Sequence, residues 1–207
     1  FVKKSDENWM NKYFSCSEKV KIDLFLRYGS IAAAGDRHLA EFCPGDWYLK
    51  DKETVEKWGF ALTPVSWRKG DLEKRLERSE KLYSGEEKFE LKETGEEGVQ
   101  QIRALLGLGD LVTNVNIPNY GQIPNLPIGA VVETNACFRA NSLNPVFAGN
   151  IPQAIYPLIS RVCGEQEQVV DCALNRDLDG VFNAFAADPN MCISVSDARK
   201  LFDEMVD

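Results

Sequence analysis

The sequence predicts an α+β fold in which mixed helices accompany an antiparallel sheet. Two strand-like segments, residues 111–117 and 130–134, flank a connection rich in proline, asparagine and glycine, which is the pattern of an antiparallel pair. Apolar residues recur at helical spacing before these strands and again after residue 152. Strands gathered in one part of a chain, with helices on either side, are typical of α+β folds.

Several helices are expected before the strands. The first runs over residues 6–28, where apolar side chains recur at helical spacing and Gly29 provides the usual C-terminal stop. Shorter helices are expected over residues 51–57, 71–78 and 98–106. The helix over 71–78 is highly charged, which is typical of a solvent-exposed face, and we assign it no chemistry.

The chain after the strands is expected to be helical and to serve as scaffold. Pro157 lies inside the first helical pattern there and predicts either a kink or a later start of that helix. Asp177 is expected to cap a helix over residues 178–187. Ser194 or Ser196 is expected to cap the last helix of the chain.

Composition excludes several function classes. The 207 residues carry a net charge of −8, and no basic face is evident, so we expect no nucleic-acid partner. No apolar run is long enough to cross a bilayer, so no membrane partner is expected. The six cysteines are dispersed, without a C-x-x-C pair or a histidine at metal-ligand spacing. This pattern favours free thiols, a cytoplasmic protein and no metal site within the chain.

The segment of residues 35–42 carries the strongest chemical signal. It brings Asp36, Arg37, Glu41 and the only histidine of the chain, His38, into six consecutive residues. In a helix, His38 and Glu41 are three residues apart and share one face. The structural alternative is a helix start in which Asp36 is the N-cap, Arg37 is solvated and His38 fills a gap in the core.

Two other groups of residues have both a binding and a structural interpretation. The tryptophans between residues 44 and 70 either stack against a ligand ring or pack in the core. Asn119 and Asn125, in the connection between the strands, either hold a polar ligand or only form turns.

Three motifs together resemble one enzyme family. Residues 119–127 read Asn-Tyr-Gly-Gln-Ile-Pro-Asn-Leu-Pro and are followed by Ala-Val-Val-Glu at 130–133, which resembles the family signature N-x-G-x-I-x-N-L-P … A-x-V-E. Residues 36–44 resemble its H-x-x-E-[YF]-x-P segment, and residues 177–205 resemble its closing helices. The family is that of the NAD- and metal-dependent glycoside hydrolases of family 4. The α-galactosidase and α-galacturonidase branch is the most similar.

The resemblance implies a domain organisation. Members of this family have an N-terminal dinucleotide-binding domain and a C-terminal α+β domain similar to that of lactate and malate dehydrogenases. Residues 1–207 are therefore expected to form a single C-terminal, substrate-side domain that lacks the NAD-binding domain and is inactive alone. NAD and Mn²⁺ are expected to be held mainly by the missing half, so no cofactor or metal ligand is assigned here. The expected partners are a sugar substrate and further copies of the same protein.

The resemblance also implies a mechanism. Enzymes of this family oxidise the sugar at C3 with NAD, remove the acidified C2 proton with a base, and eliminate the aglycone before water adds. They stand outside the usual scheme of two catalytic carboxylates. The base of the family falls in or just before the segment of residues 36–44. Asp36 is the first candidate for this base and Tyr28 is the second.

The remaining candidate residues are assigned to substrate binding. Arg37 is expected to pair with a substrate carboxylate if the sugar is a uronic acid. His38 and Glu41 are expected to bind hydroxyl groups or to orient the base, and Asn119 to donate to substrate or cofactor. Two other functions stay open. One is a non-catalytic assembly domain in which residues 36–41 form a structural ion cluster, and the other is the C-terminal domain of a 2-hydroxy-acid dehydrogenase.

Overall fold

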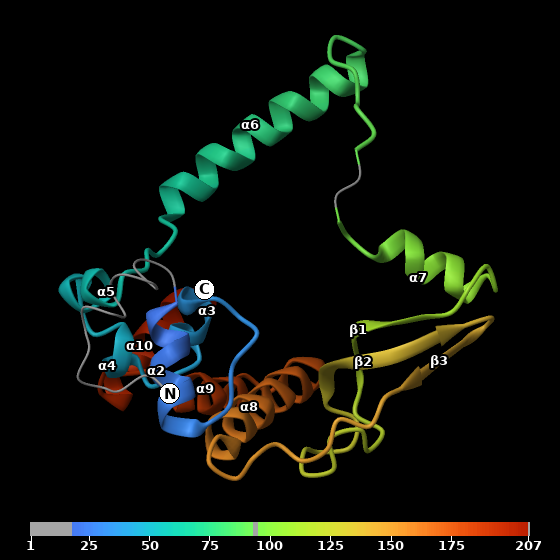
Figure 1. Ribbon diagram of the computed structural model, residues 1–207. Helices are drawn as coiled ribbons and strands as arrows, with labels where there is room; N and C mark the ends of the chain where they lie inside the picture. Colours follow the sequence, from blue (N-terminus) through green and yellow to red (C-terminus); the bar gives the residue numbers. More distant parts are fainter. Residues whose placement is uncertain (1–17, 93–94, 207) are drawn as a thin grey trace. The chain divides into compact units, whose positions relative to one another are not determined.

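A computed structural model describes residues 18–92 and 95–206 of the chain (Figure 1). The chain divides into two compact units, which we describe separately. Within the described residues, the first unit comprises 18–61, 114–135 and 145–206, and the second comprises 62–92, 95–113 and 136–144. The expectation of one domain over residues 1–207 concerns the whole chain and stays a prediction.

The described elements are helices and one sheet. The helices are α2 (Lys19–Tyr28), α3 (Asp36–Glu41), α4 (Gly45–Tyr48), α5 (Lys52–Trp58), α6 (Val65–Ser84), α7 (Gly98–Leu105), α8 (Tyr156–Asn175), α9 (Leu178–Ala187) and α10 (Val195–Val206). The three-stranded sheet has the order β1 (Leu111–Pro118), β2 (Val131–Arg139) and β3 (Ser142–Pro145). This is the α+β architecture that the sequence predicts. None of the helices within 18–92 and 95–206 is long and apolar enough to span a membrane.

The core of the first unit forms where α2 packs against α3 and α3 against α4. Val20 and Leu24 on α2 lie on the same side of the helix and are 0% and 4% exposed. They join Ala40, Cys43 and Tyr48 in one buried cluster. Burying an apolar side chain the size of valine or leucine stabilises the folded state by about 1.5–3 kcal/mol. This cluster therefore fixes α3, and the polar residues on it, against α2.

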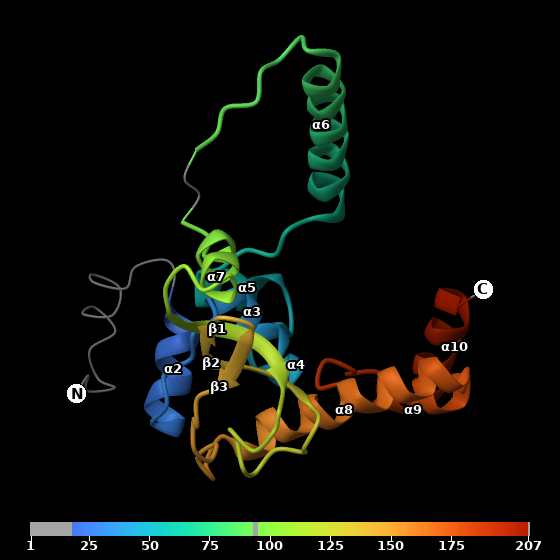
Figure 2. The same ribbon diagram turned by 90° about the vertical axis from the view of Figure 1, so that its right-hand side faces the viewer.

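The C-terminal helices pack in sequence, α8 against α9 and α9 against α10 (Figure 2). The ring of Phe202 on α10 lies 5.5 Å from that of Phe182 and 5.7 Å from that of Phe185, both on α9. As predicted, the Asp177 side chain caps α9 by accepting a hydrogen bond from the Gly180 amide at 2.9 Å. Ser194 is the residue that accepts from the first turn of α10.

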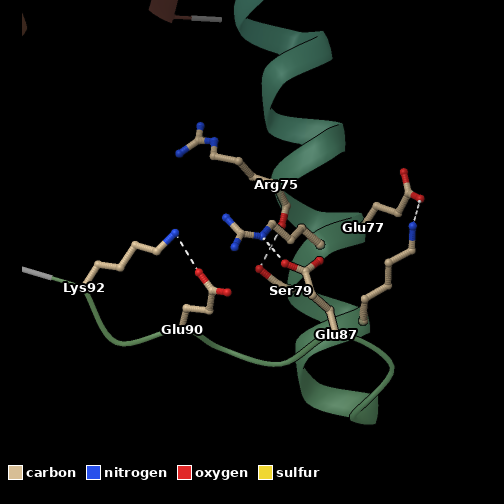
Figure 3. Close-up of polar contacts among 8 residues, drawn as sticks. Arg75, Glu77, Ser79, Glu87, Glu90 and Lys92 are labelled. Carbon is tan, nitrogen blue, oxygen red and sulfur yellow. Dashed lines mark hydrogen bonds and ion pairs between the residues drawn. The ribbon is translucent and has the colours of Figure 1, made fainter. Parts of the chain in front are cut away.

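The second unit contains α6 and α7. Helix α6 is 20 residues long, and none of its residues is buried. Ion pairs line it: Lys81 binds Glu77 at 2.6 Å, and Arg78 binds Glu87 in the segment that follows the helix at 2.8 Å (Figure 3). The backbone amide of Asn141, in the turn between β2 and β3, donates a 2.9 Å hydrogen bond to the carbonyl of Leu105, the last residue of α7.

Several predicted boundaries are corrected by the structure. Helix α2 begins at Lys19, and the part of the predicted helix over residues 6–17 lies outside the described residues. Helix α6 is longer than predicted in both directions, β2 continues to Arg139, and β3 was not predicted. Pro157 gives a later start rather than a kink, because α8 begins at Tyr156 with this proline in its first turn.

Candidate functional site

The polar segment singled out in the sequence forms the short helix α3. Its first residue, Asp36, is only 4% exposed. One carboxylate oxygen of Asp36 accepts a hydrogen bond from the Val20 amide, and the other accepts one from the Lys21 amide, both at 3.0 Å. These are two of the amides that a helix leaves unpaired in its first turn. Glu18, at the N-cap position of α2, makes no side-chain capping bond.

Asp36 thus caps a helix other than its own. The structural interpretation of the sequence made Asp36 the N-cap of α3, but the N-cap of α3 is Gly35. A carboxylate at a helix N-terminus is stabilised by the unpaired amides and by the helix dipole. The contacts of Asp36 therefore hold α3 against the start of α2. Each oxygen of the Asp36 carboxylate already accepts one of these hydrogen bonds, so the carboxylate has less capacity left to accept a proton from a substrate.

The rest of α3 presents a polar face. Glu41 and His38 are exposed, and their Oε2 and Nδ1 atoms lie 3.4 Å apart. The other ring nitrogen of His38, Nε2, lies 3.3 Å from the guanidinium of the half-buried Arg37. The predicted shared face of His38 and Glu41 is confirmed. His38 does not fill a gap in the core, because its side chain is 53% exposed.

Helix α3 is also held at its C-terminal end. The side-chain amide of Asn190, in the loop after α9, donates to the Glu41 carbonyl at 2.5 Å. The Gly45 amide donates to the carbonyl of Pro189 in the same loop at 3.0 Å. Both ends of α3 are therefore positioned by elements distant in sequence, which gives the polar face a fixed backbone. Asn190 carried no signal in the sequence, because its partner is a backbone carbonyl 149 positions away.

Tyr28, the second candidate base, is the last residue of α2 and is half-buried. Its ring lies 5.6 Å from the guanidinium carbon of Arg27. None of the described residues forms a hydrogen bond with the Tyr28 hydroxyl. Unlike the Asp36 carboxylate, this hydroxyl is not engaged by the part of the chain that the structure describes.

A second polar cluster lies beside Tyr28 and was not found from the sequence. The Arg27 guanidinium binds Asp23 at 2.7 Å, and the hydroxyl of the buried Tyr48 donates to the same carboxylate at 2.6 Å. Arg27 also donates to that hydroxyl and lies 4.5 Å above the Trp47 ring. Burial and the neighbouring Asp23 raise the pKa of Tyr48, so its phenol stays neutral. The cluster is built to position α2 and α4 and supplies no base.

The buried residues around this cluster are chemically inert. Burial raises the pKa of the Cys43 thiol to about 11, so little thiolate is present at neutral pH. Trp58 packs edge-on against Tyr48, with ring centroids 4.9 Å apart. Trp47 and Trp58 therefore follow the core interpretation of the aromatic segment rather than the ligand-stacking one.

The asparagines between the strands have structural roles. Asn119 is 0% exposed. Its side-chain nitrogen donates to the carbonyls of Ile123, Leu126 and Pro127. Its side-chain oxygen accepts from the amides of Gly121 and Ile123, both at 3.1 Å. The amide therefore has no hydrogen-bonding capacity left for a substrate or cofactor, and Asn119 takes the turn-forming role of the alternative interpretation.

Asn125 is also engaged with the backbone. It exchanges two 2.9 Å hydrogen bonds with the amide and carbonyl of Ile151. It thereby ties the connection between the strands to the segment that leads into α8. The signature over residues 119–127 is thus explained by the architecture of the loop.

Neither an apolar cavity beside α3 nor the titratable side chains of the described residues form a cofactor site. A cavity of about 270 Å³ lies in the first unit and is lined mostly by apolar side chains, such as Leu39, Val132 and Leu158. Its lining suits apolar groups rather than a sugar. Within residues 18–92 and 95–206, no three or more His, Cys, Asp and Glu side chains are grouped to hold a metal ion. The polar face of α3 is therefore the candidate site, and Tyr28, at the opposite end of α2 from the amides that Asp36 caps, is a separate candidate for the base.

Comparisons with known proteins identify relatives over the whole chain. The chain is 63% identical over 207 residues to an α-galacturonidase of Thermoanaerobacterium saccharolyticum. The aligned region covers 100% of this chain and 44% of that protein. It is 49% identical over 201 residues to an α-galacturonidase of Thermoanaerobacter italicus, at 97% and 44% coverage. An α-galactosidase of Rhizobium meliloti is 26% identical over 208 residues, at 93% and 41% coverage. The chain thus spans less than half the length of these relatives.

Solved structures show the same fold. The structure of a Bacillus subtilis protein described as a glucosidase, LplD, superposes on this chain with a TM-score of 0.83 at 48% sequence identity. The matched region covers 91% of this chain and 42% of the LplD chain. The 6-phospho-β-glucosidase of Thermotoga maritima, solved with manganese, NAD⁺ and glucose-6-phosphate, has a TM-score of 0.59 at 19% identity. The matched region covers 84% of this chain and 40% of that protein's chain. The family model described as the family 4 glycosyl hydrolase C-terminal domain matches residues 1–191. The chain therefore belongs to family 4 of the glycosyl hydrolases and corresponds to the C-terminal domain of these enzymes.

Proposed function

We propose that the chain is the substrate-side domain of an α-galacturonidase, an enzyme that hydrolyses α-linked galacturonic acid. The observation that carries this proposal is the 63% identity, over all 207 residues, to a relative of that name. The α-galactosidase of Rhizobium meliloti is only 26% identical. A neutral galactoside is therefore the less supported substrate.

The chemistry of α3 agrees with an acidic sugar. Galacturonic acid differs from galactose by a carboxylate at C6, and a guanidinium is the side chain best suited to bind a carboxylate through two parallel hydrogen bonds. Arg37 supplies this group on the polar face of α3, beside His38. We propose that Arg37 binds the substrate carboxylate, while His38 and Glu41 bind sugar hydroxyls.

NAD and Mn²⁺ are proposed as the cofactors of the full-length enzyme. When bound, they would supply a hydride acceptor and a cation that polarises the sugar oxygens. The described residues do not offer a metal site of their own, as no suitable group of ligands is present among them. No step is therefore assigned to a metal within this chain, and the contribution of the chain is to bind the sugar and to remove a proton.

The contacts of the two candidate bases support Tyr28 ahead of Asp36. A general base needs an acceptor atom within reach of the proton that it removes. Each carboxylate oxygen of Asp36 already accepts a hydrogen bond from a backbone amide of α2, whereas the Tyr28 hydroxyl forms no hydrogen bond with the described residues. We propose Tyr28, in its deprotonated phenolate form, as the base and Asp36 as the residue that positions α3.

The test is hydrolysis by the full-length enzyme in heavy water. With NAD, Mn²⁺ and nitrophenyl α-galacturonide, we expect rapid release of galacturonate that carries deuterium at C2, because the C2 proton is removed and replaced from solvent. Nitrophenyl α-galactoside is the matched control and is expected to react far more slowly. Mass spectrometry and proton NMR of the released sugar measure the label.

Each alternative outcome has a clear meaning. Hydrolysis without deuterium at C2 would exclude the elimination route and indicate conventional carboxylate catalysis. Equal rates on both glycosides would remove the role proposed for Arg37. No hydrolysis of either glycoside would leave the assembly function as the better explanation of the chain.

A further inference from the structure

Helix α6 carries an apolar seam that the described residues of its own unit leave exposed. Val65, Leu72, Leu76 and Tyr83 are 70%, 49%, 57% and 96% exposed, respectively. They are spaced seven, four and seven residues apart, which places them on one line along a helix. This spacing is that of the inner positions a and d of a coiled coil, with Val65 and Leu72 at d and Leu76 and Tyr83 at a.

The two remaining inner positions are polar and compatible with a helix pair. Lys69 occupies an a position and Ser79 a d position. A single lysine at an a position lowers the stability of a coiled coil but specifies its register and oligomeric state. The segment after α6 is bound outside the inner positions, because Arg78, which pairs with Glu87 at 2.8 Å, occupies a c position of the same register.

The charged residues that flank the seam select one partner. Arg68 and Arg75 lie at the g positions on one flank, and Glu73 and Glu80 lie at the e positions on the other. In a parallel pair, each g residue faces the e residue five places further along the second helix. A second copy of α6 would therefore bring Arg68 beside Glu73 and Arg75 beside Glu80, on both sides of the seam.

An antiparallel pair of the same helices is disfavoured. In that arrangement g residues face g residues and e residues face e residues, so arginines would meet arginines and glutamates would meet glutamates. Like charges placed opposite each other oppose association and suppress the wrong arrangement. The charge pattern is therefore self-complementary only in the parallel orientation.

We propose that the protein self-associates through α6, which pairs with α6 of a second copy as a parallel, two-stranded coiled coil. The occupant of the seam is the same helix of a second copy because both its apolar line and its flanking charges match themselves. This inference does not depend on the substrate or on the cofactors of the enzyme.

Charge exchange between two variants tests the proposal. One variant carries Arg68→Glu and Arg75→Glu, and the other carries Glu73→Arg and Glu80→Arg. Each variant alone places like charges across the seam, so its dissociation constant is expected to rise by about tenfold or more. An equimolar mixture restores opposite charges on both flanks and is expected to form a mixed dimer. Sedimentation equilibrium of the whole chain measures all three samples and the wild type.

Disulfide trapping tests the parallel orientation. In a parallel pair the two copies of residue 79 face each other at a d position, within the distance that a disulfide spans. Ser79→Cys is therefore expected to cross-link two chains under mild oxidation, as shown by peptide mapping. Lys74→Cys, on the far side of α6, is the control and is expected not to cross-link through residue 74.

Two results would overturn the proposal. One is a wild-type chain that stays monomeric up to about 0.1 mM, a concentration at which only an interaction of roughly millimolar strength would escape detection. The other is a dimer whose dissociation constant is the same in both charge variants, because its interface would then lie elsewhere. A dimer that responds to charge but fails to cross-link at residue 79 would exclude the parallel register.

Discussion

At the scale of single residues, Asp36 shows how a chemical signal in sequence can have a structural cause. Its carboxylate completes the first turn of α2, where Val20 and Lys21 present amides without an intrahelical partner. The sequence predicted a cap or a base but not this particular cap. Backbone amides 15 and 16 positions earlier in the chain leave no trace in side-chain identities.

We predict that Asp36→Ala lowers the free energy of unfolding of the chain by about 2–3 kcal/mol, because two hydrogen bonds to backbone amides and the interaction of the carboxylate with the α2 dipole are lost together. Asp36→Asn is expected to lose less, since its amide oxygen can still accept one hydrogen bond. Glu41→Ala, at the exposed end of the same helix, is the control and is expected to change stability by less than about 0.5 kcal/mol. Urea denaturation followed by circular dichroism measures the three variants.

The same variants distinguish the two roles proposed for Asp36. If Asp36→Asn folds as stably as the wild type, yet the full-length enzyme that carries it has no turnover, then the carboxylate acts on the substrate. If stability falls and the remaining activity follows the folded fraction, Asp36 is a positioning residue. The contacts with α2 favour the second result.

Two other residues mark what spacing can predict and what it cannot. The pairing of His38 with Glu41 follows from their separation within one helical turn, and the structure confirms it. The role of Asn119 depended on whether its amide faced solvent or the loop. Burial of the Asn119 side chain within the folded loop decides between the two roles. The sequence of the loop does not show that burial, so it left both the turn-forming and the ligand-binding role open.

At the scale of elements, the predictions succeeded where a local signal marks an end. The boundaries of α9 and its cap at Asp177 agree with the sequence, because capping and the following proline act within a few residues. The start of α6 was missed, because Trp67 and Gly70 made the preceding segment look irregular. Strand β3 was missed because it has only four residues, and two of them, an asparagine and a proline, are of types depleted in strands.

The start of α9 provides a prediction whose direction opposes helix propensity. A Cβ atom at Gly180 would lie closer to the Cys172 sulfur and to the Asp177 carboxylate than real Cβ atoms approach such groups. Both contacts would have to be relieved, so the Asp177 carboxylate that caps α9 and the Cys172 side chain on α8 would each have to move. We expect Gly180→Ala to lower the melting temperature and to destabilise the chain by about 2 kcal/mol.

Gly164, within α8, is the matched control. A Cβ atom there meets nothing within 4 Å, so Gly164→Ala is expected to stabilise the chain by about 0.5–1 kcal/mol through helix propensity alone. Calorimetry on both variants measures the difference. If Gly180→Ala raised the melting temperature as Gly164→Ala does, the close packing of α8 against the cap of α9 would be excluded.

At the scale of the whole molecule, the order of the motifs was more informative than any one of them. The motif over residues 119–127 and the segment over 36–44 each have structural explanations, yet together they predicted the family that matches residues 1–191. The reason is that a family signature records the architecture as well as the chemistry. Asn119 belongs to the first kind of residue, and we propose that the polar face of α3 belongs to the second.

This distinction leads to a prediction for the chain by itself. Its sequence has no Gly-x-Gly-x-x-Gly after a strand, and the described residues offer no metal-binding group. We therefore expect the isolated 207-residue chain, supplied with NAD, Mn²⁺ and nitrophenyl α-galacturonide, to release no nitrophenol above the blank. The full-length enzyme, assayed in parallel, is expected to release it.

The folded state of the isolated chain has to be checked in the same samples, because an unfolded chain would also be inactive. A helical circular dichroism spectrum and a cooperative melt would show that inactivity reflects missing groups rather than lost structure. Turnover by the chain alone that is abolished by a metal chelator would contradict the prediction. It would require a metal site within these residues, and the His38–Glu41 pair on α3 would be the first place to substitute, since it already joins an imidazole and a carboxylate on an exposed face.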